Sequence, residues 1–281
     1  MRHSIFVSLC LGSALVLSAC GDTNGNAVDR KLQDVNVIDE TNLNEVMLTS
    51  ADPNEAVAYF QRASAQYPER IDLSRGLATS LIRAKRNTEG VIAWRKVSEH
   101  EEALPSDNVE LADALIRAGK WDEAEQVLDA IPPTHETFER YRLEAMIADA
   151  NKEWDKSDSF YEIALGLTTK PAGVMNNWGF SMLTRGDYAE AERLFSDAIR
   201  NDESLFTAKN NLVLARAAQR NYTLPVVPMT QVERAQLLHT AALSAIKQGD
   251  IETGKGMLRE ALETHPQYFE EAQRALDALE A

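Results

Sequence analysis

Apolar residues recur along this chain at intervals of three and four positions, the spacing that gathers side chains on one face of an α-helix. The clearest example is the stretch 172–205, in which two such faces are joined by a short polar turn. Gly179 lies in the first face, and Ala191 and Phe195 lie in the second. Small residues let two antiparallel helices approach closely, while a large residue beside them fills the remaining space. The stretch therefore predicts a helical hairpin.

Copies of this hairpin precede it with a period of 33 or 34 residues. The earlier units open at four positions: Val37, Ile71, Pro105 and Phe138. One hairpin cannot bury its own apolar face, so in-phase copies are expected to stack into a continuous core. After the unit at 172–205, Phe206 opens a first helix that breaks after Tyr222. We therefore predict five full repeats and the first helix of a sixth over residues 37–222.

The pattern changes over residues 223–281. Pro225 and Pro228 exclude a regular helix from the segment 221–230. This segment is either a plain connector or, because it is more apolar than a linker needs, a strap or partner-binding loop. Two helices then follow as a last repeat of the same kind, and the amphipathic stretch 267–281 predicts a helix that caps the open end of the array.

The hairpin at 172–205 resembles one tetratricopeptide repeat (TPR), a helix–turn–helix unit of 34 residues. It keeps four residues of the family signature: Gly179, Ala191, Phe195 and Ala198. Trp178 stands where Leu is usual, and Glu203 stands where the closing Pro is usual. The resemblance implies an all-α fold, a right-handed superhelical solenoid of helix–turn–helix repeats with a C-terminal capping helix. It also implies a concave groove lined by the first helices of the repeats.

In known TPR modules the sixth place of each first helix faces the groove, and Asn177 and Asn211 hold that place here. Asn176 and Asn210 precede them, so the resemblance implies amides that stand one above the other. An amide both donates and accepts hydrogen bonds, which suits the backbone of an extended peptide. Phe180 lies three places after Asn177 and would supply an apolar contact. Alternatively, the asparagines only cap or solvate the inner face.

Two arginines complete the candidate groove. Arg75 and Arg142 hold the fifth place of their helices, beside the groove-facing position. A guanidinium at that place could pair with a carboxylate of the partner.

The first residues of the chain have the pattern of an export signal. Residues 1–3 form a short basic region, residues 5–16 are apolar, and the string Leu-Ser-Ala-Cys ends at Cys20. This string resembles a bacterial lipobox, which implies that residues 1–19 are a signal peptide and that Cys20 is lipidated. The alternative is an ordinary signal peptide with a chance cysteine. By the same resemblance, Gly21 implies an outer-membrane lipoprotein that faces the periplasm of a Gram-negative bacterium.

A polar stretch follows the expected lipidation site. Residues 20–36 have little periodicity, which predicts a flexible tether. The folded body is therefore expected to stay close to the membrane that the lipid on Cys20 enters.

The sequence carries no recognisable catalytic motif. The five histidines lie outside any metal-ligand spacing, and there is no phosphate-binding loop or Gly-x-Ser-x-Gly string. Cys10 lies in the segment expected to be removed, which leaves Cys20 as the mature cysteine and no disulfide. A net charge of −15 opposes binding to nucleic acid. We therefore expect a protein that is not an enzyme and uses no cofactor, metal or small-molecule substrate.

Together these features favour a lipid-anchored periplasmic scaffold that binds another protein. Over most of its length the chain resembles the TPR lipoproteins of the tight-adherence (Tad/Flp) pilus machinery. The resemblance rests on the lipobox, the chain length and the segment from Asn176 to Ala217. It implies a role in pilus biogenesis or secretin localisation, with an outer-membrane secretin or another pilus component as partner. The alternatives are a scaffold for outer-membrane protein assembly and an accessory scaffold for a cell-wall enzyme.

Overall fold

The computed structural model describes residues 43–280. These residues form helices and no strand. A helical segment at 43–49 is followed by thirteen helices. They are α2 (Pro53–Gln66), α3 (Ile71–Arg83), α4 (Asn87–Ser98), α5 (Pro105–Arg117), α6 (Trp121–Asp129), α7 (Phe138–Ala150), α8 (Trp154–Gly166), α9 (Ala172–Arg185), α10 (Tyr188–Asn201), α11 (Phe206–Ala218), α12 (Gln231–Lys247), α13 (Ile251–Thr264) and α14 (Glu270–Glu280). The expected signal peptide (1–19), the lipidation site Cys20 and the tether (20–36) lie outside the described residues.

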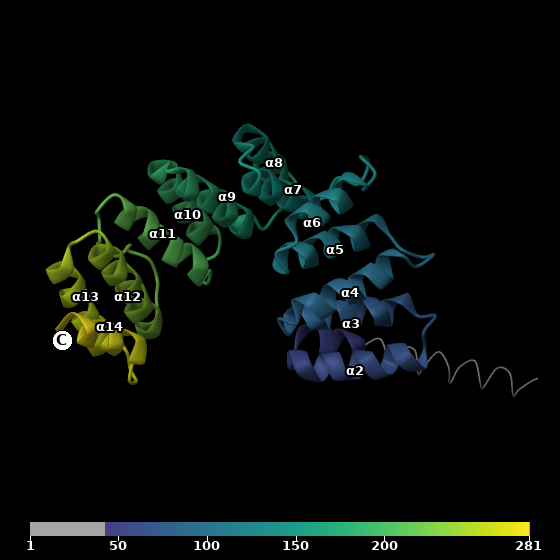
Figure 1. The fold of residues 1–281 in the computed structure, drawn as a ribbon, viewed down its shortest axis with the longest axis horizontal. Helices are drawn as coiled ribbons and strands as arrows, with labels where there is room; N and C mark the ends of the chain where they lie inside the picture. The colour runs from purple at the N-terminus through teal and green to yellow at the C-terminus, as the bar shows by residue number, and fades with distance from the viewer. Residues whose placement is uncertain (1–42, 281) are drawn as a thin grey trace, which may run out of the picture.

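The helices form antiparallel pairs that stack into an arch (Figure 1). α3 packs with α4, α5 with α6, α7 with α8, and α9 with α10, so each pair is one repeat. α2 lies at one end of the arch, α8 at its top, and α12, α13 and α14 at the other end (Figure 1). This arrangement confirms the predicted all-α solenoid.

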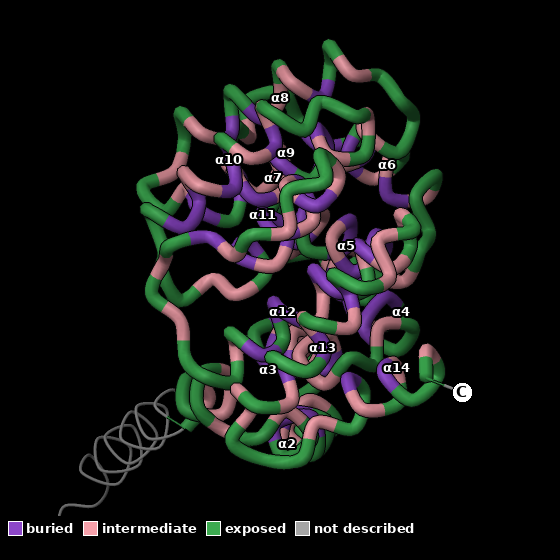
Figure 2. Tube along the Cα trace, turned by 90° about the vertical axis from the view of Figure 1, so that its left-hand side faces the viewer, coloured by how far each residue is buried: buried purple, intermediate pink, exposed green. Residues whose placement is uncertain are grey.

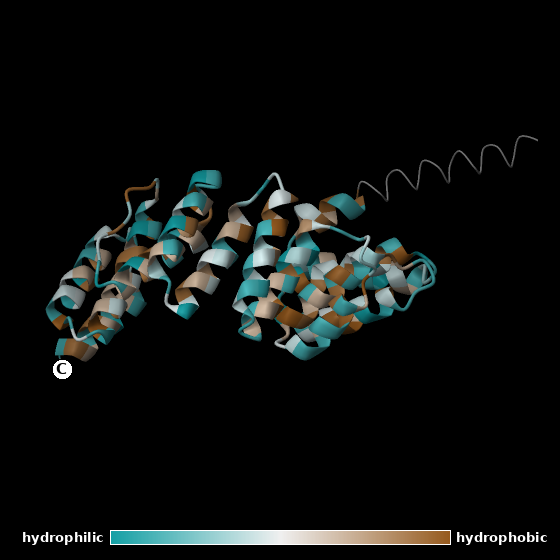
Figure 3. Cartoon of the chain, turned by 90° about the horizontal axis from the view of Figure 1, so that it is seen from above, coloured by the Kyte–Doolittle hydropathy of each residue, from teal (hydrophilic) through white to brown (hydrophobic). Residues whose placement is uncertain are grey.

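Burial follows the interfaces between helices. Buried stretches alternate with exposed ones along each helix (Figure 2), and hydrophobic residues alternate with hydrophilic ones in the same way (Figure 3). The core is a chain of clusters: one runs from α3 to α7, one joins α9, α10 and α11, and one joins α12, α13 and α14. Each repeat therefore buries its apolar face against its neighbours.

Close approach within the repeat at α9 and α10 depends on Gly179. A Cβ atom on this residue would lie 2.8 Å from Cε1 of Phe195, whose side chain is completely buried. The ring of Phe195 thus occupies the space that a side chain at 179 would need. A similar close contact joins two neighbouring repeats, since a Cβ on Gly76 of α3 would lie 2.4 Å from Cε1 of Phe60 in α2. Gly179 and Phe195, which the sequence predicted to pack against each other, are therefore in close contact.

The segment 221–230 replaces the second helix that α11 lacks. Pro225 is buried, and Leu224 packs against core residues of α11, α12 and α13. Val227 packs against the cluster of α9, α10 and α11. The segment therefore runs as an apolar strap over neighbouring helices, and only Val226 points its whole side chain into solvent.

The last helix covers the open end of the final repeat. Ala272 and Leu276 of α14 are buried against Leu258 of α13 and Leu238 of α12. Phe269, just before α14, lies with its ring 5.4 Å from the ring of His239. The stretch expected to act as a capping helix is thus packed on the end of the array.

We expect Gly179→Ala to destabilise the fold. The new methyl group collides with a ring that has no free space to move into, and overpacking of this kind costs about 1–3 kcal/mol. Thermal unfolding followed by circular dichroism measures the change in midpoint. Gly173→Ala is the matched control, because a Cβ there meets nothing within 4 Å and alanine favours the helix. Equal midpoints for the two variants would contradict the proposed role of Gly179.

Candidate functional site

A cavity of about 930 Å³ opens at α7, α9 and α11, and we refer to it as the inner-face cavity. First helices of three successive repeats, α7, α9 and α11, supply most of its lining. Their side chains include Met146, Asn176, Asn177, Phe180, Ser181 and Asn211. The second helices contribute Trp121 of α6, with Trp154 and Tyr161 of α8. The cavity thus combines amides with aromatic rings.

Two asparagines bridge α9 and α11. Asn211 Nδ2 donates a hydrogen bond of 3.0 Å to Asn176 Oδ1, and both side chains are buried. One bond leaves each amide with further capacity, because an amide has two donors and a carbonyl oxygen. Among the described residues, Asn176 Nδ2 and Asn211 Oδ1 have no hydrogen-bond partner. Both groups belong to residues of the cavity lining.

The other two predicted asparagines have different surroundings. Asn177 lines the cavity, and its Nδ2 lies 3.5 Å from Sδ of Met146. Asn210 Oδ1 accepts a hydrogen bond of 2.8 Å from Thr240 Oγ1, and Asn210 is not part of the lining. The structure therefore places Asn177 and Asn211 in one cavity, while the direct hydrogen bond of Asn211 goes to Asn176.

The predicted arginines are engaged within the chain. Arg75 Nε and Nη2 donate to the two carboxylate oxygens of buried Asp107, at 2.7 and 2.8 Å. This bidentate hydrogen bond raises the pKa of Arg75. Arg142 Nη2 donates to Asp113 Oδ1 at 3.2 Å. Neither arginine lines the cavity, and each already has the kind of partner expected from another protein.

Three aromatic side chains form an exposed wall. Phe180 is 50% exposed although it lies inside the lining, and Trp121 is 37% exposed. Trp154 is half-buried, and the guanidinium of Arg185 lies 5.5 Å from its ring centroid. A cation at this distance is attracted by the face of an indole ring. The cavity therefore presents partly solvated rings that a bound molecule can cover.

Asp149 at the end of α7 joins three helices beneath the cavity. Its carboxylate accepts hydrogen bonds from Ser157 Oγ at 2.5 Å, from Tyr161 OH at 2.9 Å and from Ser181 Oγ at 2.6 Å. Burial, followed by the negative charge of Asp149, raises the pKa of Tyr161, so the phenol stays protonated and donates. Three donors satisfy the two oxygens of Asp149, and α7, α8 and α9 are held together.

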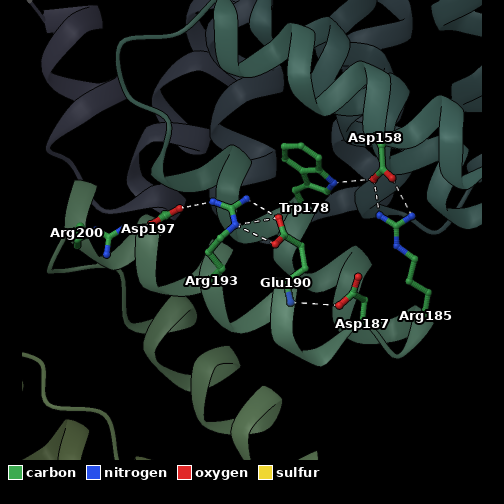
Figure 4. Close-up of polar contacts among 8 residues, drawn as sticks. All are labelled: Asp158, Trp178, Arg185, Asp187, Glu190, Arg193, Asp197 and Arg200. Carbon is green, nitrogen blue, oxygen red and sulfur yellow. Dashed lines mark hydrogen bonds and ion pairs between the residues drawn. The ribbon is translucent and has the colours of Figure 1, made fainter.

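A second carboxylate fastens α8 to α9 (Figure 4). Asp158 accepts a hydrogen bond of 2.7 Å from Trp178 Nε1 and forms an ion pair with Arg185. Arg185 uses both terminal nitrogens for this contact. Its remaining nitrogen, Nε, is buried and has no hydrogen-bond partner among the described residues. Arg185 lines the cavity, but this nitrogen is enclosed by the protein and has no surface open to a ligand.

The neighbouring charges on α10 belong to its surface. Asp187 caps the helix by accepting from the backbone N–H of Glu190 at 3.2 Å. Arg193 then bridges Glu190 and Asp197 along one face, and Arg200 pairs with Asp197 (Figure 4). Pairs three and four residues apart on an exposed helix contribute only about 0.2–0.5 kcal/mol each. They stabilise α10 and leave the cavity unchanged.

Sequence reasoning did not select Trp121, Trp154, Met146, Asp149 or Arg185 for this site. The sequence does contain a pattern that points to the two tryptophans. Trp121 and Trp154 are the first residues of successive second helices and lie 33 positions apart. This spacing is one repeat, so the two side chains hold equivalent places. Asp149 carried no such signal, since its partners come from three different helices.

Comparison with known proteins agrees with the helical repeat fold. The family model described as "Tetratricopeptide repeat" matches residues 181–224, which run from the end of α9 through α11 into the strap. The fold is a TPR solenoid. No curated protein matches the sequence.

Solved structures show the same architecture at low sequence identity. A TPR protein from Parabacteroides merdae superposes with a TM-score of 0.57 and 14% identity, covering 85% of this chain and 97% of that one. The APC/C hetero-tetramer Cut9-Hcn1 gives 0.61 and 13%, with coverage of 84% and 48%. Human IFIT1, solved as a dimer with PPP-AAAA, gives 0.57 and 16%, with coverage of 81% and 59%. The present chain thus spans about half of the Cut9-Hcn1 chain and about three fifths of the IFIT1 chain.

Residues 43–280 contain neither a membrane-spanning helix nor a cluster of metal ligands. No helix in this part of the chain has the length and apolar character needed to span a membrane. No group of three or more His, Cys, Asp or Glu side chains there is arranged to hold a metal ion.

We expect Asp158→Ala to loosen the joint between α8 and α9. The substitution leaves Trp178 Nε1 and the guanidinium of Arg185 without their acceptor, and unsatisfied buried donors cost about 1–3 kcal/mol. Urea unfolding gives the change in free energy. Glu190→Ala is the control, because it removes an ion pair from the surface of α10 and should cost at most about 1 kcal/mol. A neutral Asp158→Ala would show that the joint does not need this carboxylate.

Proposed function

We propose that this protein is an interaction scaffold, not an enzyme, and that it holds an extended segment of a partner protein in the inner-face cavity. The observation that carries the proposal is the lining. Asn176, Asn177 and Asn211 have hydrogen-bonding capacity left beside the exposed ring of Phe180. Amides suit the alternating donors and acceptors of a peptide backbone, and the ring suits an apolar side chain.

We also propose where this scaffold works. The lipobox-like string before Cys20 supports a lipid anchor, and Gly21 supports the outer membrane of a Gram-negative bacterium with the folded body in the periplasm. A polar tether over residues 20–36 would leave the cavity free to meet partners near the membrane.

The resemblance to the Tad/Flp pilus lipoproteins, called TadD, supports a particular partner. We propose a role in pilus biogenesis, with an outer-membrane secretin or another pilus component as the captured protein. An outer-membrane protein assembly machine or a cell-wall enzyme is the alternative client, and the same cavity would serve it.

A crosslinked pull-down of the lipidated protein from envelope membranes tests the scaffold and its client. We expect Asn177→Ala combined with Phe180→Ala to capture several-fold less partner than the parent protein. Both side chains line the cavity without holding the core, so helicity should not change. Recovery of a secretin supports the pilus role, whereas recovery of barrel-assembly or peptidoglycan proteins rejects it.

The control for this pull-down is Ile163→Ala. Ile163 is an exposed apolar residue on α8 that does not line the cavity. Its loss should leave capture at the parental level. Undiminished capture by the double variant would exclude the inner-face cavity as the binding site.

Membrane attachment has a separate test. We expect Cys20→Ser to abolish incorporation of labelled palmitate and to move the protein from the membrane fraction to the soluble fraction. Cys10→Ser, in the segment expected to be removed, should keep both properties. Persistent labelling of Cys20→Ser would argue against lipidation at this residue.

A further inference from the structure

The aromatic wall of the inner-face cavity is built from equivalent places of neighbouring repeats. Trp121 and Trp154 open α6 and α8, and Phe180 faces them from α9. Two of these rings keep a large exposed surface, 37% for Trp121 and 50% for Phe180. Apolar surface gathered in a hollow is a binding feature, because covering it with a ligand releases water from both partners.

The other groups of the lining favour an aromatic occupant over an aliphatic one. Rings pair with rings in stacked or edge-to-face geometry more favourably than area alone explains. Met146 brings a sulfur atom, which makes favourable contacts at ring edges. Arg185 and Lys152 bring cations, which are attracted to ring faces. An aliphatic side chain would gain none of these three contributions.

The polar lining suits the backbone on either side of such a ring. Asn176 Nδ2 and Asn211 Oδ1 have no hydrogen-bond partner among the described residues, so the lining offers both a donor and an acceptor. Lys152 adds a further donor, since it forms no ion pair within the described part of the chain. A peptide backbone carries both N–H and C=O groups and therefore matches this lining.

We propose that the inner-face cavity selects partner segments by an aromatic anchor residue, whose ring lies between Trp121, Trp154 and Phe180. This inference rests on the proposed function, because it names the residue type that the scaffold recognises. It adds two specificity-determining indoles that lie outside the first helices.

The test uses acetylated, amidated peptides Gly-Gly-X-Gly-Gly with X as Phe, Tyr, Trp or Leu. Each is titrated into the full chain while the indole N–H signals of its four tryptophans are followed by NMR. The Phe, Tyr and Trp peptides should shift the signals of Trp121 and Trp154 and leave that of buried Trp94 in place. They should bind about 2- to 10-fold more tightly than the Leu peptide, which is the advantage of an aromatic pair.

Substitutions show which side chains produce the preference for aromatic peptides. Trp121→Leu and Phe180→Leu should each abolish the preference for aromatic peptides. Tyr188→Leu is the matched control and should retain it. Tyr188 opens α10 one repeat after Trp154 and is similarly exposed, but it does not line the cavity.

Three results would overturn the proposal. One is equal affinity for the Phe and Leu peptides, and another is no shift from any peptide at concentrations of about 10 mM. The third is a shift of the same indoles by a chitin oligosaccharide without any shift by the peptides, which would assign the cavity to a glycan. If the pull-down recovers no partner but the peptides still show the aromatic preference, the scaffold role is rejected and the aromatic selectivity of the cavity stands. The two experiments therefore test the two proposals separately.

Discussion

Every repeat of this protein depends on its neighbours to bury the apolar face that a single hairpin leaves open. Leu143 and Ile147 of α7 complete the cluster that begins at α3, and Leu212 of α11 completes the one at α9 and α10. Because each contact reaches only the next repeat, the arch is held by a succession of local interfaces. Within a pair, the two helices approach closely where a small residue meets a large one, as Gly179 meets Phe195.

Buried carboxylates join the helices beside the inner-face cavity. Asp149 and Asp158 receive donors from α8 and α9, so the helices around them are tied at specific atoms. These hydrogen bonds act together with an apolar cluster of the same helices, which includes Tyr161 and Val174. The rings of Trp121, Trp154 and Phe180 border the cavity. The candidate site therefore lies where polar and apolar contacts together join the repeats.

The spacing of apolar residues along the sequence predicts the helices. It does not predict which side chains meet between one repeat and the next. α3, α5, α7, α9 and α11 begin at Ile71, Pro105, Phe138, Ala172 and Phe206, where the periodic pattern opens its units. Asn176, Asn177, Phe180 and Asn211 do share one cavity, as their register suggested. Arg75 instead meets Asp107, 32 residues away, and Asn210 meets Thr240. Such partners depend on the angle and offset between helices, which a period alone does not contain.

The strap at 221–230 also limits how this architecture can change in length. Whole repeats before α11 are interchangeable in principle, because each presents the same kinds of faces to its neighbours. The strap is different, since Leu224 and Val227 reach clusters on opposite sides of it. A duplication or deletion of one repeat unit across this point would separate an extended segment from the helices it fits. The strap therefore divides the chain into two parts: an array that can gain or lose whole repeats, and a C-terminal unit in which the strap and its helices have to be kept together.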